Sequence, residues 1–306
     1  MIDITSKRFR FFLISGVVIL VGIISLAVFG LQTGIELRGG SLLTLSFEQE
    51  VGLSELRAEL GSLGYSNTIV QTTGEGDYLI RTTTLSTEGK GQLKENLTAK
   101  FGLSDEKSFE DIDPIIARQT ARTASIAVAI AAVGILLYIT WAFRRMPKPF
   151  RYGTCAIIAL LHDTLVALGV FSIISGILGW EINLMFITGI LAVIGYSVNN
   201  TVVVFDRIRE NLHESPNSDF EIIVNNSLTE TLTRSLNTSL TTIIVVLALL
   251  LFVGSTIQNF TVVLLIGVVA GTFSSLFIAP LLLVVWEKGE WRRFTRRLSV
   301  KAFSNN

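Results

Sequence analysis

Charged side chains are scarce in this sequence. Asp, Glu, Lys and Arg make up 16% of the 306 residues, while apolar residues make up 50%. The mean hydropathy is +0.58, whereas an ordinary soluble domain carries about 25% charged residues. The scarcity excludes an ordinary soluble domain and favours a membrane protein. Because the formal net charge is zero, bulk charge gives no indication of a nucleic-acid partner.

Cysteine and histidine are almost absent. The single cysteine, Cys155, excludes an internal disulfide and a cysteine-based metal cluster, and its apolar surroundings are typical of a small buried residue. Two histidines are too few for us to expect a metal centre. The sequence also lacks a Walker loop, HExxH, CxxC or any readable Ser-His-Asp arrangement. We therefore expect neither enzyme activity nor a cofactor.

Long apolar runs fill much of the chain. Five of them can cross about 30 Å of hydrocarbon without a charged residue, and a sixth of similar length carries Asp163. The first run resembles a signal peptide, but its 21 apolar residues and the lack of a clear cleavage site favour a retained helix. The six expected spans are 11–31, 123–143, 152–176, 182–205, 236–257 and 260–286.

Basic residues predict the orientation of these spans. Sixteen of the 25 Lys and Arg lie at the N-terminus, in 144–151, in 205–235 and after 286, which are alternate connections. Since Lys and Arg concentrate on the cytoplasmic side, both termini are expected there. The expected domains are 1–33 (N-terminus and first helix), 34–118 (outer domain), 119–286 (membrane domain) and 287–306 (cytoplasmic tail).

The outer segment, residues 34–118, is expected to form a small α+β domain. It is net acidic, with 14 acidic and 8 basic residues. Its patterns predict the order strand, helix, strand, strand, helix, strand, which is typical of a ferredoxin-like unit. The predicted elements are 41–47, 53–64, 67–73, 77–84, 86–102 and 107–115.

The stretch GIELRGG, residues 34–40, leads from the first span into this domain. One interpretation is that Gly39 and Gly40 only let the chain turn into the first strand. The alternative is that they form a functional entry motif of the outer domain together with Gly34 and Glu36. It is not a phosphate loop, because no Lys-Ser/Thr ending and no preceding strand are present.

Asp163 is the one acidic residue expected deep in a span. It stands about eleven residues into its helix, near ~16 Å depth. A carboxylate there is expected to be protonated, paired or facing a water-filled seam. The structural alternative is a protonated Asp that hydrogen-bonds a neighbouring helix. His162 points about 100° away around the helix and is not automatically its partner.

Asn199 and Asn200, followed by Thr201, interrupt another apolar run. Polar side chains in hydrocarbon cost free energy unless they are satisfied. The next span opens with a polar stripe that has Arg234 at its cytoplasmic end, and the stripe favours an inward-facing Arg234 over one that snorkels. The threonines of this stripe fit helix packing equally well; they are Thr231, Thr238, Thr241 and Thr242.

The last span contains small residues at every fourth position. Gly267, Gly271 and Ser275 would lie on one helix face. Such a seam predicts close contact with a neighbouring helix.

Five stretches together resemble the SecF family of protein-export membrane proteins, over nearly the whole chain. The resemblance implies a six-helix unit of the RND superfamily with a ferredoxin-like outer domain. It also implies a location in the bacterial cytoplasmic (inner) membrane, in contact with membrane lipid. It also implies a SecD-like partner, the SecYEG channel and an unfolded polypeptide in transit, with the proton-motive force as the energy source. The stretches are GIELRGG, FRYGTCAIIALLHDTLVALGVF (150–171), INLMFITGILAVIGYSVNNTVVVFDRIRENL (182–212), SLTETLTRSLNTSLTT (227–242) and LLIGVVAGTFSSLFIAPLLL (264–283).

Two motifs depart from the family pattern. Gly-Ile-Asp-Phe-x-Gly-Gly is GIELRGG here, which keeps an acid at Glu36 but loses the aromatic residue. The family's Asn-Asp-Thr is Asn199-Asn200-Thr201 here, and the resemblance places that Asp in a proton pathway, opposite the Arg that Arg234 matches. With Asp163, these residues form the expected proton-pathway site. Since an Asn cannot load a proton, water, Asp206 or an Asp of the partner must balance Arg234.

Two other functions remain open. An RND-type exporter of small molecules or lipids usually has twelve helices and two outer domains in one chain, whereas this sequence predicts six and one. A passive translocase scaffold fits better, because Asn200 removes one titrating group.

Overall fold

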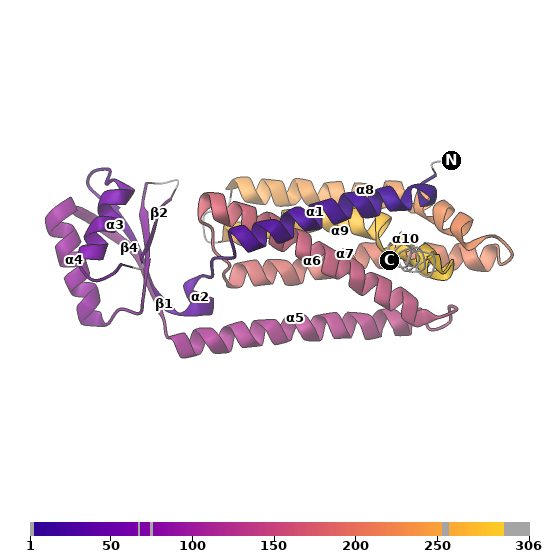
Figure 1. Ribbon diagram of the computed structural model, residues 1–306, viewed down its shortest axis with the longest axis horizontal. Helices are drawn as coiled ribbons and strands as arrows, with labels where there is room; N and C mark the ends of the chain where they lie inside the picture. Colours follow the sequence, from indigo (N-terminus) through magenta and orange to yellow (C-terminus); the bar gives the residue numbers. More distant parts are fainter. Residues whose placement is uncertain (1–2, 67, 74–75, 253–256, 291–306) are drawn as a thin grey trace, which may run out of the picture. The chain divides into compact units, whose positions relative to one another are not determined.

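The computed structural model describes residues 3–66, 68–73, 76–252 and 257–290, which form two compact units (Figure 1). One unit contains most of the long helices, and the other contains a small sheet. The helical unit comprises the described residues of Met1–Gly30, Val128–Ile174 and Thr188–Asn306, and the sheet unit comprises those of Leu31–Ala127 and Ser175–Ile187.

Six helical segments are long and apolar enough to cross a membrane, as predicted. Several are longer than their apolar runs, because the intrahelical hydrogen bonds continue into polar sequence beyond the part that hydrocarbon would cover. The segments are α1 (Arg8–Val28, preceded by the 3₁₀ turn η1, Thr5–Lys7), α5 (Pro114–Ala142), α6 (Pro149–Leu178), α7 (Leu184–Glu214), α8 (Phe220–Phe252) and the pair α9 (Gln258–Phe277) and α10 (Ala279–Glu287).

The last span is not one continuous helix, as 260–286 had suggested. Residue Ile278, with φ −111° and ψ −62°, separates α9 from α10, and Pro280 lies in the first turn of α10. Proline has no N–H to donate to the preceding turn, and its ring clashes there, so it breaks a helix interior but suits a helix start.

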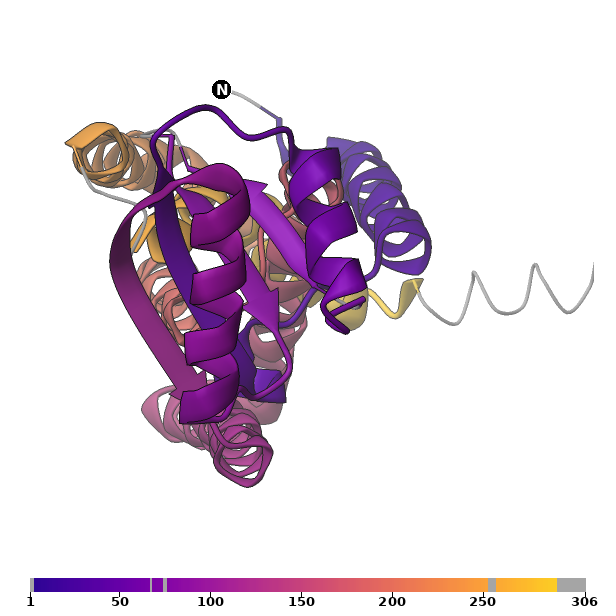
Figure 2. The same ribbon diagram turned by 90° about the vertical axis from the view of Figure 1, so that its left-hand side faces the viewer.

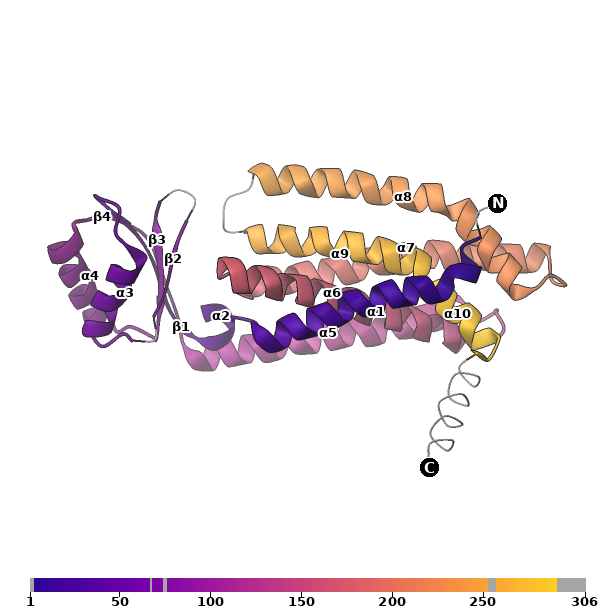
Figure 3. The ribbon, with the colours of Figure 1, turned by 45° about the horizontal axis from the view of Figure 1, so that its top comes forward.

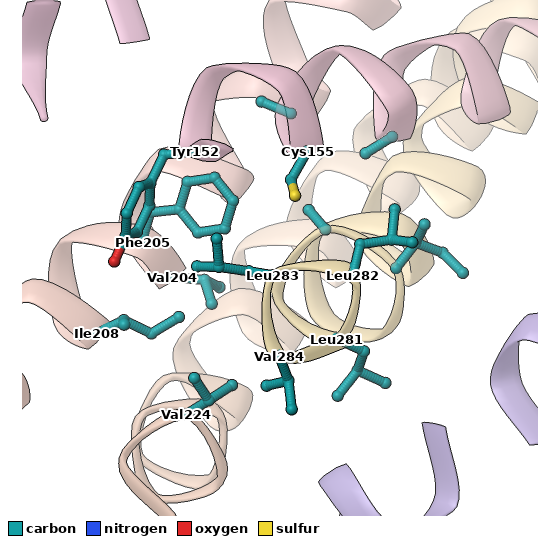
Figure 4. Packing of buried hydrophobic residues seen from close by; sticks show 14 of the residues in the cluster. Tyr152, Cys155, Val204, Phe205, Ile208, Val224, Leu281, Leu282, Leu283 and Val284 are labelled. Carbon is teal, nitrogen blue, oxygen red and sulfur yellow. The ribbon is translucent and has the colours of Figure 1, made fainter. Parts of the chain in front are cut away.

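Aliphatic side chains and a few aromatic rings fill the core of the helical unit where α6, α7 and α10 meet (Figure 4). Tyr152 stacks on Phe143 with ring centroids 5.4 Å apart and meets Phe205 edge-on at 5.3 Å. Cys155 is fully buried, and Figure 4 shows its sulfur directed toward α10. The prediction of a small buried packing residue is therefore confirmed.

Small residues bring helices into close contact, as the seam on the last span predicted. A Cβ added at Gly267 would lie 2.0 Å from Val193 Cγ2, and one at Gly271 would lie 3.0 Å from Ser197 Cβ. Helix α9 thus packs closely on α7. It also lies beside α8, as Figure 3 shows.

The sheet unit has the predicted β-α-β-β-α-β order. Its four antiparallel strands lie in the order β2-β3-β1-β4, and both helices cover one face (Figure 2). Alternate residues of β1 and β3, among them Leu43, Leu45 and Ile80, are fully buried in the core. The elements are β1 (Gly40–Phe47), α3 (Leu53–Ser62), β2 (Ile69–Thr72), β3 (Tyr78–Thr82), α4 (Thr87–Phe101) and β4 (Leu103–Ile112).

Three local features differ from the sequence prediction. The GIELRGG stretch contains a one-turn helix, α2 (Ile35–Arg38), and β4 begins at Leu103 rather than at 107. Helix α5 already begins at Pro114, because Asp113 caps it: its Oδ1 accepts a hydrogen bond from the Ile115 N–H at 2.7 Å.

Candidate functional site

Asp163 on α6 is fully buried and contacts two other helices. Its Oδ2 accepts hydrogen bonds from Ser197 Oγ on α7 (2.6 Å) and from Ser274 Oγ on α9 (2.7 Å). Its Oδ1 lies 2.9 Å from His162 Nδ1. We call these four residues the Asp163 cluster.

The Asp163 cluster can hold a proton at more than one atom. A carboxylate only accepts hydrogen bonds, whereas a protonated carboxyl also donates one; a neutral imidazole carries its proton on either ring nitrogen. Because its Nδ1 lies 2.9 Å from Asp163 Oδ1, His162 is a partner of Asp163, although adjacent helical positions diverge by about 100°. Its ring lies against Phe273, with centroids 6.3 Å apart.

The three polar residues 199–201 occupy different surroundings. Asn200 is 4% exposed, and its Nδ2 has no hydrogen-bond partner among the residues that the structure describes. Thr201 Oγ1 donates to the Ser197 carbonyl one turn earlier at 3.0 Å. The Asn199 side chain is exposed. Position 200 is thus a buried amide one turn from the Asp163 cluster, with donor capacity left over.

Arg234 does not face the interior of this chain's helical unit, so the prediction of an inward-facing side chain is wrong for the chain alone. It is exposed, and within residues 3–252 and 257–290, apart from 67 and 74–75, it makes no ion pair. The buried face of α8 instead contains Ser235 and Ser239, and Arg234 lies about 100° around the helix from Ser235. Asp206, one expected counter-ion, pairs with Arg209 at 2.7 Å.

The threonines below Arg234 bond to their own helix. Thr238 Oγ1 donates to the Arg234 carbonyl, and Thr241 and Thr242 donate to the Thr238 carbonyl, each at 2.9 Å. Their hydroxyls are therefore satisfied, while Thr238 and Thr241 stay exposed and Thr242 is half-buried. Together with Arg234 they form an exposed polar face of α8.

Gly39 and Gly40 are required by backbone conformation and by space. Their φ angles are +86° and +127°, a region that side chains with a Cβ rarely adopt. A Cβ on Gly39 would lie 2.7 Å from Pro114 Cα, and one on Gly40 would lie 2.5 Å from the Thr82 carbonyl oxygen. The glycines thus permit both the turn and the close approach of α5 and β3.

Gly34 joins the start of the sheet unit to the connection between α6 and α7. The Gly34 N–H donates to the Ile182 carbonyl at 2.8 Å, and the Ile182 N–H donates to the Gln32 carbonyl at 2.7 Å. A Cβ on Gly34 would lie 2.6 Å from Glu36 Oε2. This pairing was not visible in the sequence, because about 150 residues separate the two segments.

Glu36 lies near a buried charged pair. Arg81 Nε of β3 lies 2.8 Å from Glu181 Oε2 of the α6–α7 connection. Burial is the main cause that raises the pKa of Glu36, and Glu110 raises it further. Burial likewise raises the pKa of Glu181, while Arg81 opposes that shift. Burial lowers the pKa of Arg81 in turn, and Glu181 counteracts it.

The comparisons with known proteins identify the family. The family model described as "Protein export membrane protein SecD/SecF, C-terminal" matches residues 92–289, and the one described as "SecD/SecF GG Motif" matches residues 24–51. The chain belongs to the SecD/SecF family. The resemblance found in the motifs is thus confirmed, and with six apolar helices the chain is a multi-pass membrane protein.

Individual relatives cover the chain almost completely. It is 43% identical to the protein translocase subunit SecF of Thermobaculum terrenum, over 99% of both chains. It is 35% identical to the protein translocase subunit SecDF of Bacillus subtilis, over 95% of this chain and 39% of that one. The crystal structure of SecDF from Thermus thermophilus, described as a translocon-associated membrane protein, matches with a TM-score of 0.83 and 28% identity. That match covers 94% of this chain and 39% of the SecDF chain.

Proposed function

We propose that this chain is a SecF-type translocase subunit that works with a SecD-type partner and the SecYEG channel, and that the proton gradient drives it. The observation that supports this most is the Asp163 cluster, a buried carboxylate whose hydrogen bonds join three helices. Similarity over nearly the full chain to a relative named protein translocase subunit SecF supports the transport role. The proposal includes no catalytic step and no cofactor.

Proton uptake would change the contacts of the Asp163 cluster. The ionised carboxylate accepts from both serine hydroxyls on Oδ2, whereas a proton on that oxygen would make it a donor. One hydroxyl must then direct its own proton to another acceptor. Ser274 Oγ already lies 3.3 Å from the Gly271 carbonyl of its own helix, so the α6–α9 hydrogen bond is the one with an alternative. Ser274 would then donate to Gly271 and accept from the protonated carboxyl, so protonation would reverse the direction of the α6–α9 hydrogen bond.

The partner would supply the charge that this chain lacks at position 200. Asn200 cannot titrate, and Arg234 is exposed without an ion pair among the described residues. An exposed cation in a membrane helix needs a counter-charge or water. We place the SecD-type partner on the exposed polar face of α8, where a carboxylate of the partner would meet Arg234.

The sheet unit would lie on the outer side of the membrane, with both termini in the cytoplasm. The concentration of Lys and Arg in alternate connections supports this orientation. Strands β2 and β4 form the two edges of the sheet. Edge strands offer unpaired backbone groups to an extended chain, which suits contact with an unfolded polypeptide or with the partner.

A passive scaffold is the second candidate, because Asn200 has no accessible protonation equilibrium. Vesicles that contain SecYEG and a SecD-type partner, with or without this chain, can distinguish the two. We expect the chain to increase export of an unfolded substrate only while the proton gradient is maintained. Stimulation that survives an uncoupler would favour the scaffold, and no stimulation at all would refute both.

A further inference from the structure

The five-residue connection between α6 and α7, residues 179–183, is held at several points inside the sheet unit. Arg81 pairs with Glu181, and the Gln71 side-chain amide donates to the Gly179 carbonyl. The backbone of Ile182 is paired on both sides, with Gln32 and with Gly34. We call the Arg81–Glu181 pair with its Gln71 contact the outer clamp.

The outer clamp is largely shielded from water. The side chain of Arg81 is 12% exposed and that of Glu181 is 5% exposed. Gln71 links β3 to the connection, since its Oε1 accepts from Arg81 Nη1 at 2.5 Å while its Nε2 donates to the Gly179 carbonyl. Glu36 and Arg38 are the further charges that act on this pair.

A buried ion pair of this kind is weak evidence for stability. Its desolvation cost roughly cancels its attraction, and apolar replacements are often as stable or more stable. Its best-attested role is to fix one arrangement among several. Here a pair fixed to β3 adds a side-chain contact to the backbone pairing of Ile182, and so restricts the position of the short connection further.

The connection matters because of the helices on either side of it. Helix α6 runs without a break from Asp163 to Leu178, and α7 runs without a break from Leu184 to Ser197. These two helices carry the carboxylate and one of its hydroxyl donors. A shift of the connection along either helix axis would therefore reach that hydrogen bond, since a helix is a rigid element.

We infer that Arg81 and Glu181 are positioning residues through which the ferredoxin-like unit holds the α6–α7 connection, and with it the geometry that proton-driven export requires. The inference rests on the proposed function for its consequence in export. The holding of the connection can be tested independently of it.

Amide hydrogen exchange of the full chain in lipid nanodiscs tests the holding. In Glu181→Gln, the amides of Ile182 and Gly34 should exchange about tenfold faster or more, because their local opening becomes easier. The amide of Leu45 in β1 should keep its rate, which shows that the sheet is intact. The matched control is Glu106→Gln, which removes the ion pairs with Lys90 and Lys94 between α4 and β4 and should leave the connection unchanged.

A double-mutant cycle of Glu181→Gln and Arg81→Gln tests whether the two residues act as a pair or have independent effects on the exchange rates. If the residues act together, the double variant should exchange no faster than the faster single variant. The outer clamp would be refuted if the rate increases of the two single variants multiplied in the double variant. It would also be refuted if Glu181→Gln left the exchange rate of the Ile182 amide unchanged.

Export then tests the role of the outer clamp. Each single variant should lose most of the stimulation seen in vesicles, whereas Glu106→Gln should keep it. A loosened connection with full stimulation would refute the positioning role while leaving the proposed function intact. If the unmodified chain does not stimulate export, the proposed function fails, and the exchange rates still decide whether the outer clamp exists.

Discussion

Replacing Asp163 with Asn removes the one buried carboxylate of the cluster while keeping its shape. One of its two oxygens becomes an N–H donor, so at least one of the contacts from His162, Ser197 or Ser274 must change. Hydrogen bonds to a charged group contribute about 1.5–3 kcal/mol each. We expect the loss of about one such bond, since the new N–H donor cannot accept a hydrogen bond. The bond from Ser274 is the one expected to be lost, because its hydroxyl can turn to the Gly271 carbonyl.

Asn200→Ala provides the comparison, because it changes a buried polar side chain that lacks such partners. The Asn200 Nδ2 atom makes no hydrogen bond among the described residues, so its removal relieves a desolvation penalty while leaving a small void. These opposing contributions should leave a net change of about 1 kcal/mol or less. Asp163→Asn should therefore impair export more strongly, since it also removes a proton-binding group.

The assay is proton-driven export in vesicles, with each variant present at the same level as the unmodified chain. Stability of the purified variants, measured by thermal unfolding in detergent, separates misfolding from lost coupling. We expect Asp163→Asn to fold but to lose stimulation, and Asn200→Ala to retain most of it. If Asp163→Asn exports normally while Asn200→Ala abolishes export, the assignment of proton binding to the Asp163 cluster is wrong.

Three further predictions follow from other parts of the chain. Gly267→Leu should separate α9 from α7, because even a Cβ there would lie 2.0 Å from Val193 Cγ2. A variant whose thermal unfolding temperature equals that of the unmodified chain would contradict this packing. With the single native cysteine replaced by serine, a cysteine at Thr73 should react with a membrane-impermeant reagent from outside and one at Ser215 should not; the opposite labelling would reverse the topology. Hydrogen bonds from Lys90 foremost, and from Lys94, lower the pKa of Glu106 below its ordinary value of 4.5. The resulting stability is present above that value and is lost as pH falls through the lowered pKa, so Glu106→Gln should flatten the acid side of the sheet unit's unfolding profile, and an unchanged profile would count against the ion pairs.

Much of the fold could be predicted from sequence because it depends on local patterns. Apolar runs of sufficient length mark spans, and alternation with turn signals marks the strands of the sheet unit. The break at Ile278 was missed, although Pro280 was visible, because the apolar run continues through it. The start of α5 was missed because its first turns are polar enough to resemble the end of the outer domain.

The candidate site could be predicted only in part. Asp163 and Asn200 stand out in the sequence because each is a polar residue in an apolar run. Their partners do not stand out: Ser197 and Ser274 resemble ordinary packing residues, and only the fold brings them to Asp163. The Arg81–Glu181 pair was missed for the same reason, since a hundred residues separate its members.

The position of Arg234 is why our proposal assigns part of the proton pathway to a partner. The buried face of α8 uses Ser235 and Ser239, and Ser239 accepts hydrogen bonds from Tyr196 and Thr272. Turning Arg234 inward would rotate Ser239 out of these hydrogen bonds. In our proposal a partner therefore covers this exposed face; the solved SecDF chain is longer, and the match covers 39% of it. The Asp163 cluster is internal to this chain, whereas the charge opposite Arg234 is, in our proposal, supplied by the partner.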